Sequence, residues 1–162
     1  MDFKRGDILP GKLQESVIAF ANADGGELFV GIANDRTLPP AHRIHGFANE
    51  EVANNHVAIP ERMIDPALLG VTMEFLCLPS KTSELVLHFI IPKSEKIHYT
   101  SSGECYKRKG AQNLRIREKD IENLSYTKGQ KSYEDTFVDT VTADDLGAFV
   151  YFVNYLCLVL FV

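Results

Sequence analysis

The chain has 162 residues, 45% of them hydrophobic and 24% charged, which is typical of a globular domain with its own core. Its formal net charge of −5 excludes a uniformly basic nucleic-acid-binding protein. The three cysteines, Cys77, Cys105 and Cys157, fit neither a disulfide framework nor a zinc site, so we expect reduced thiols and no metal or other cofactor. The N-terminus lacks the apolar core of a signal peptide, and we expect a cytoplasmic protein.

The first third of the chain predicts a helix followed by a buried strand. Apolar residues recur at helical spacing over 12–23, which predicts the first and longest helix. Gly25 and Gly26 end this helix, because glycine accepts the left-handed backbone found at many helix C-termini. The segment 27–33 is apolar nearly throughout, as in a central strand, and Gly31 within it indicates close approach of another backbone or a bulge.

The following segments predict short strands with short helices between them. We expect a short helix over 50–55, a helix or turn over 60–69, strands over 69–78, 84–91 and 104–109, and a helical turn or two over 118–124. Residues 1–5 form a strand end or an extended arm. Several strands are close enough in sequence to pair antiparallel. We therefore predict an α+β fold: a mixed, largely antiparallel sheet with one long N-terminal helix and short helices packed on it.

The C-terminal segment 136–162 reads as an apolar helix. Thr142 and Asp145 fit a capping box, and no charged residue follows Asp145. The run 146–162 has 17 residues and contains Asn154, at the short limit of about 17–25 for a membrane span. We expect it to pack on the domain, on a partner chain or on a second copy, rather than to anchor in a membrane. The predicted division is a domain over 1–135 and this helix, as the start of a truncated following segment.

Positive charge is concentrated in one segment. Over residues 101–131, eight basic residues outnumber four acidic ones, so this segment carries +4 while the rest of the chain carries −9. A basic patch on an acidic protein can attract a polyanion to one face, or it can be an ordinary solvated surface. Strand alternation predicts that Cys105, Lys107 and Lys109 point to one side and Arg108 to the other.

Several blocks of sequence, in this order, resemble the Schlafen-type AlbA-like domain. FANADGGELFVGI at 20–32 is similar to its signature F-A-N-(T/S/A)-x-G-G-x-L-x-x-G-(I/V), with structural positions at Asn22, Gly25, Gly26 and Gly31. Asp2-Phe3-Lys4 resembles the family's E-F-K. Residues 86–116 resemble its later part, with a valine-rich strand, a proline, Tyr-Lys-Arg-Lys-Gly and Ala-Gln-Asn, and SYED at 132–135 often follows the domain. The resemblance covers about residues 2–135.

The resemblance implies a DNA-binding or transcriptional-regulator module, as bacterial and archaeal members are described. Lysine and arginine give such a module affinity by neutralising phosphates, without choice of sequence. No helix resembles a recognition helix, so we expect backbone contacts and a non-enzymatic module that prefers DNA to RNA. The candidate contact residues are Lys4, Arg5, Lys107, Arg108, Lys109 and Arg115.

Besides DNA binding, two other functions stay open: an enzyme, as a metal-dependent nuclease or an ATP-binding and hydrolysing module, and a protein-interaction scaffold. Animal relatives cleave structured RNA with acidic residues and a divalent metal, but here Ala33 follows Gly31-Ile32 and only Asp2 and Asp35 remain as candidates. We expect Asp2 to be a flexible terminal acid and Asp35 a turn residue, which leaves no catalytic or metal-binding residue. ATP binding, which has also been ascribed to the family, lacks a phosphate-binding loop here, because the glycines precede a strand. The third function is a protein-interaction scaffold that dimerises through 146–162.

Overall fold

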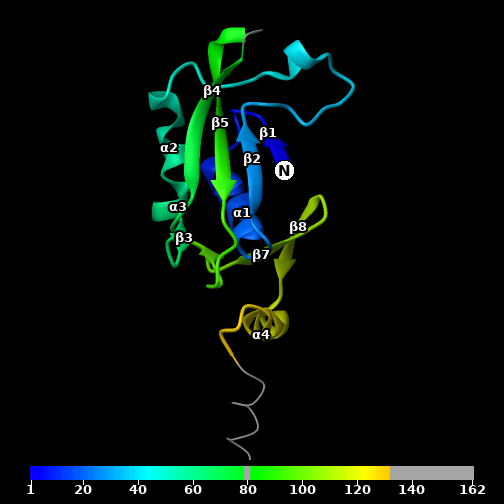
Figure 1. Ribbon diagram of the computed structural model, residues 1–162, viewed down its shortest axis with the longest axis vertical. Coiled ribbons are helices and arrows are strands. Elements are labelled where there is room, and N and C mark those ends of the chain that lie inside the picture. Colours follow the sequence, from blue (N-terminus) through cyan, green and yellow to red (C-terminus); the bar gives the residue numbers. More distant parts are fainter. Residues whose placement is uncertain (79–80, 132–162) are drawn as a thin grey trace, which may run out of the picture.

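The computed structural model shows an α+β fold of two four-stranded sheets, mostly antiparallel, and confirms the predicted fold class (Figure 1). It describes residues 1–78 and 81–131, so the predicted helix over 136–162 and its proposed contacts lie outside the described residues. Within this described part, no helix has both the length and the hydropathy needed to cross a membrane.

The first sheet has the strand order β1-β2-β5-β4. Its strands are β1 (Asp2–Lys4), β2 (Gly26–Val30), β5 (Lys81–Ile91) and β4 (Thr72–Leu78). β1 pairs parallel with β2, and the other neighbours are antiparallel. Strand alternation places Leu28, Leu87 and Phe89 on the face that builds the main core, while Phe29 and His88 point to the opposite face.

The second sheet has the order β3-β6-β7-β8. Its strands are β3 (Ile64–Asp65), β6 (Tyr99–Thr100), β7 (Cys105–Lys109) and β8 (Gln112–Ile116), and α4 (Glu118–Thr127) follows the last of them. A small separate core of Ile97, Cys105 and Leu124 joins this sheet to α4. We had predicted a single sheet; the strands divide into two because a helix lies between them.

That helix is α1 (Pro10–Ala21), and it lies behind the first sheet in Figure 1. Every residue from Ser16 to Ala21 is buried, because α1 packs on the first sheet from one side and on β7 from the other. A helix enclosed in this way is apolar around most of its circumference rather than along one stripe. α1 therefore connects the two sheets.

The prediction of a long N-terminal helix is wrong. α1 has 12 residues, close to the mean of about 11–12 for globular proteins. It begins at Pro10, whose fixed φ suits the first turn, and it ends at Ala21 with Asn22 as its C-cap. Gly25, with φ 76°, completes the turn, and its amide donates to the Phe20 carbonyl at 3.0 Å. The other helical segments are short: η1 (Pro40–Arg43), η2 (Glu51–Ala53), α2 (Asn54–Val57) and α3 (Ile59–Arg62). Figure 1 shows α2 and α3 beyond the β4 edge of the first sheet.

Candidate nucleic-acid interface

The basic segment forms a β-hairpin, which we call the basic hairpin and define as β7, β8 and the turn between them. A two-residue turn joins the strands, with Gly110 at φ 58°, a positive value of the kind that tight hairpin turns require. Lys107 pairs with Leu114, and Arg108 with Asn113. Residues that pair across the two strands have their side chains on the same face of the hairpin. The polar side chains of one face therefore point toward α1, and those of the other face point to solvent.

On the α1 side, Arg108 is held by four partners. Its Nη1 donates to Oδ2 of Asp2 at 2.9 Å and to Oδ1 of Asn113 at 2.7 Å. Its Nε donates to the Gly110 carbonyl, and the guanidinium lies 4.9 Å from the ring centroid of Phe20. The side chain is only 10% exposed. Arg108 therefore fastens the hairpin to β1 and α1 and is not available as a phosphate contact.

The position of Asp2 corrects a second expectation. Asp2 is not a flexible terminal acid: it belongs to β1, is 7% exposed, and receives a hydrogen bond from the Phe3 amide. Lys4 Nζ lies 3.3 Å from its carboxylate, so Asp2 joins Lys4 and Arg108 in one cluster. The cluster connects the N-terminal strand to the basic hairpin.

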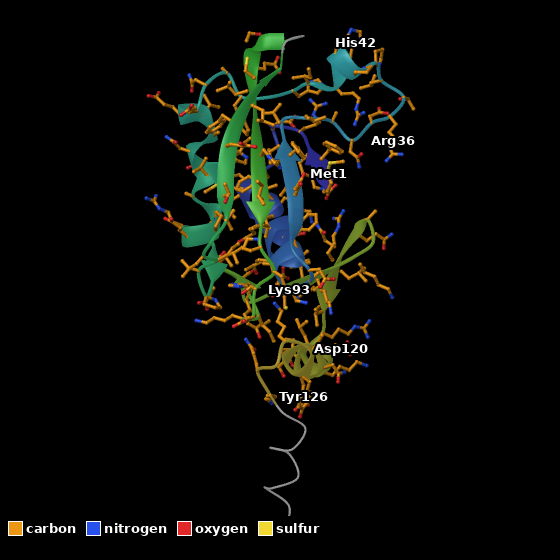
Figure 2. The ribbon with its side chains drawn as sticks, in the orientation of Figure 1. Met1, Arg36, His42, Lys93, Asp120 and Tyr126 are labelled. Atoms are coloured by element: carbon orange, nitrogen blue, oxygen red, sulfur yellow. The ribbon has the colours of Figure 1, made fainter. Side chains whose placement is uncertain are left out.

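On the solvent side, the hairpin and α4 enclose a groove of about 460 Å³, which we call the hairpin groove. Lys107 and Lys109 stand on its hairpin wall, and Leu114, which is 43% exposed, contributes to its apolar floor. Asp120 and Asn123 come from α4, and Figure 2 shows Asp120 on that helix below the hairpin. The groove thus has an apolar floor, a basic wall and one acidic side chain.

Lys128, the C-cap residue of α4, fixes the position of the helix wall. Its ammonium donates to the carbonyls of Ala21, Ser94 and Lys96 at 3.1, 2.6 and 2.9 Å. Burial lowers the pKa of Lys128 to about 8, and Lys93 and Lys107 add to this decrease. The three carbonyls include one at the C-terminus of α1, where a cation is favoured by the helix dipole. This contact holds α4 against α1 and the β5–β6 connection.

The six predicted contact residues differ in how their charge is balanced. Four of them have a carboxylate within ion-pair distance: Lys4 and Arg108 share Asp2, Arg5 pairs with Asp7 at 3.2 Å, and Arg115 pairs with Glu104 at 3.0 Å. Lys107 and Lys109 have no carboxylate partner among residues 1–78 and 81–131. The structure brings these two, Arg115 and Arg108 together on one hairpin, with Lys4 connected through Asp2. Arg5 lies apart from the groove lining.

The signature residue Asn22 has a structural role here. It is 2% exposed; its Nδ2 donates to the carbonyls of His98 and Tyr106 at 2.8 and 3.0 Å, and its Oδ1 accepts the His98 amide at 2.9 Å. Gly25 has φ 76°, and a Cβ there would lie 2.6 Å from the Ile91 carbonyl oxygen. A larger residue at Gly25 would therefore separate the end of α1 from β5.

The described residues do not fit a divalent metal. Asp2 is already paired with two cations, Asp35 accepts two hydrogen bonds from Thr37, and the Ala33 side chain has no oxygen. No group of three or more His, Cys, Asp or Glu side chains is arranged to hold a metal ion in the described ranges. A hard cation requires several converging oxygens, and this geometry does not supply them.

Comparison with known proteins decides the family. A family model described as Schlafen, AlbA_2 matches residues 1–117, well over half of the chain. The chain belongs to this family. Membership in the Schlafen AlbA_2 family is consistent with a nucleic-acid-related module. A search of curated proteins finds no match.

Among solved structures, the chain is similar to the DIP2311 protein from Corynebacterium diphtheriae, with a TM-score of 0.54 and 20% identity. The match covers 82% of this chain and 27% of that protein, so the chain spans about a quarter of its length. At this identity the likeness concerns the fold alone.

Sequence reasoning missed the apolar floor of the groove, and it predicted the helix wall only as a helical turn or two over 118–124. Residues 112–116 alternate weakly, with only Leu114 and Ile116 apolar, and the strand β8 was not predicted. The predicted alternation agrees with the strand register, in which Lys107 is opposite Leu114 and Arg108 is opposite Asn113. No local signal identifies Lys128, because its three acceptors come from residues far away in sequence.

Proposed function

We propose that this domain binds DNA through its phosphate backbone, without cleaving it, and that the solvent face of the basic hairpin is the contact surface. The observation that carries the proposal is the pair Lys107 and Lys109, which project from one strand without a carboxylate partner among the described residues. Such ammonium groups bind phosphates by releasing condensed counterions and lose no existing ion pair when they do so.

Neighbouring charges support the same surface. Arg115 is two-thirds exposed beside the groove, and Arg117 and Lys119 are exposed at the start of α4. Asp120 on the opposite wall is the acidic residue of the groove lining, so the lining is positive overall. The surface attracts a polyanion locally, even though the chain is acidic as a whole.

The mode of binding follows from what the hairpin presents. Lysines on a strand contact phosphates, whereas sequence choice needs side chains that reach base edges. We therefore propose a module that supplies affinity and position within a transcriptional regulator, with little sequence preference of its own. The family resemblance supports the regulator role.

The test is fluorescence anisotropy of labelled duplex DNA, single-stranded DNA and structured RNA across a salt series. In the double variant Lys107→Glu with Lys109→Glu, we expect weaker binding and a slope of log affinity against log salt that is less steep by about 2. The matched control is Lys93→Glu with Lys96→Glu, which changes net charge equally at two exposed lysines outside the groove. We expect this control to keep the slope.

Three outcomes would count against the proposal. Equal effects of the two double variants would mean that net charge, not the hairpin, governs binding. Tighter binding to RNA than to DNA would contradict the stated preference. Cleavage of the same nucleic acids after incubation with Mg²⁺, detected on a gel, would contradict the proposal that the domain does not cleave DNA. This holds whether or not Asp2→Asn abolishes the cleavage.

A further inference from the structure

A second cavity, separate from the hairpin groove, lies at the β1 edge of the first sheet. It measures about 490 Å³, within the usual range of about 300–1,000 Å³ for small-molecule sites. Phe3, Ile32 and Ile44 form its apolar part, and Asn34, Arg36 and Arg43 its polar part. Phe3 and Asp2 are adjacent on one strand, so the cavity lies on the face opposite the Asp2–Arg108 cluster.

Arg43 is held in place at this cavity by its own loop. Its Nε donates to the Ala33 carbonyl at 2.9 Å, and its carbonyl accepts the Ala33 amide at 2.7 Å. The guanidinium carbon lies 5.9 Å from the Phe3 ring centroid. The terminal nitrogens of Arg43 have no acceptor in the described part of the chain. They are therefore oriented in advance for an anion that accepts two hydrogen bonds.

Arg36 supplies a second guanidinium from the same loop. Figure 2 shows Arg36 at the outer side of the loop that carries His42, on the same side of the molecule as Met1 of the N-terminus. Within the described ranges, Arg36 has no hydrogen-bond or ion-pair partner. Asp35 does not line the cavity, but it lies near it: the Thr37 hydroxyl and amide donate to its carboxylate at 2.6 and 2.9 Å, and these bonds together with the positive charge of Arg43 lower its pKa. The cavity lining thus holds two arginines and no carboxylate, and Asp35, outside the lining, balances part of the charge of Arg43.

The apolar wall is planar and rigid. Phe3 stacks on Phe29 with centroids 5.5 Å apart, and Phe29 stacks on His88 at 4.1 Å with 7° between the rings. His88 is held in turn by Glu74, whose carboxylate lies 2.8 Å from Nδ1. Phe3 is therefore the end of a packed column across three strands and offers a fixed aromatic surface to a ligand.

From these features we infer that the cavity binds an organic phosphate with a planar ring, of the nucleoside monophosphate class. Arg43 and Arg36 hold the phosphate, and Phe3 with Ile32 and Ile44 packs against the ring. The site is independent of the DNA contact proposed for the basic hairpin.

The test is a titration followed by backbone amide shifts in nuclear magnetic resonance, with adenosine 5′-monophosphate, adenosine and inorganic phosphate as probes. The monophosphate is expected to shift the amides of Asn34 and Arg36 and to bind at least about tenfold more tightly than either fragment. Arg36→Gln, which removes no internal contact, should weaken binding about tenfold, as should Arg43→Gln. Arg62→Gln, at an exposed arginine on α3, should leave it unchanged.

The double variant Lys107→Glu with Lys109→Glu separates the two sites. Retained monophosphate binding in this variant supports the inference, even if DNA binding fails in every protein tested. Absence of shifts at Asn34 and Arg36 would overturn the inference. Equal binding by inorganic phosphate and the monophosphate would also overturn it, because the aromatic wall would then contribute nothing.

Discussion

Replacement of Asn22 tests whether the family signature is structural in this chain. Asn22→Ala removes the carboxamide that joins the end of α1 to His98 and Tyr106. Three backbone groups then lose a partner: the His98 amide, the His98 carbonyl and the Tyr106 carbonyl. All lie inside the protein, where His98 is 2% and Tyr106 9% exposed.

The magnitude follows from these three groups. An unsatisfied buried group costs about 1–3 kcal/mol, and carbonyls are at the lower end because they have a second lone pair. We therefore expect a loss of about 4 kcal/mol in the free energy of unfolding. Total stabilities are only about 5–15 kcal/mol, so the urea midpoint should fall by about 2 M.

The assay is urea unfolding followed by circular dichroism, with Asn55→Ala as the control. Asn55 is exposed on α2 and makes no described hydrogen bond, so this change should leave the midpoint nearly unaltered. Asn22→Asp keeps the shape but replaces the donor by an oxygen facing two carbonyls, and should cost at least as much as Asn22→Ala. A loss below about 1 kcal/mol for Asn22→Ala would refute this account of the signature.

Three further predictions concern other parts of the fold. Asp2→Asn leaves the buried Arg108 without its carboxylate and should lower the free energy of unfolding by about 3 kcal/mol, measured by urea unfolding. Asp24→Asn, which removes an exposed ion pair with Lys93, should leave the urea midpoint unchanged. Equal effects of the two variants would contradict the structural role of Asp2. Gly25→Ala should lower the thermal unfolding midpoint more than Gly103→Ala. Both glycines have positive φ, but of the two only Gly25 would bring a Cβ against backbone atoms. Equal decreases of the midpoint would exclude this Cβ contact as the cause. Burial lowers the pKa of His98 below 6.5, so the unfolded chain binds more protons than the folded chain as the pH falls below 6.5. The free energy of unfolding should therefore be constant with respect to this group above pH 6.5, decrease on acidification, and decrease less steeply in His98→Phe. Parallel pH profiles of the two proteins would contradict this.

The tautomer of His98 gives the last prediction its physical basis. Nδ1 lies 2.6 Å from the Pro66 carbonyl, which can only accept, so Nδ1 carries the proton. Nε2 then accepts from the Ser94 hydroxyl at 2.7 Å. Protonation of Nε2 would reverse this second bond, so that the Ser94 oxygen accepts, and would place a positive charge in a buried site. The folded state therefore favours the neutral ring.

Several features of the fold could be predicted from sequence because they are local. Glycine and proline fix the ends of the predicted elements, and apolar spacing identifies α1, β2 and β5 within a few residues. Alternation along 104–109 also predicted opposite sides for Lys107 and Arg108, in agreement with their successive positions on β7. The strand β8 was missed because a polar, exposed strand has almost no hydrophobic pattern to detect.

The fold class, the family, the position of α1 and the concentration of positive charge in 101–131 follow from local patterns of residues. Which of those charges have a carboxylate partner depends on how distant segments pack together. Arg108 and Lys107 are neighbours of the same sign, yet Arg108 pairs with Asp2, whereas Lys107 has no carboxylate partner in the described part of the chain. The difference arises because β1 and β7, more than a hundred residues apart, meet across α1. Alternation along the strand separates the two side chains, but only long-range packing decides which of them lies beside Asp2.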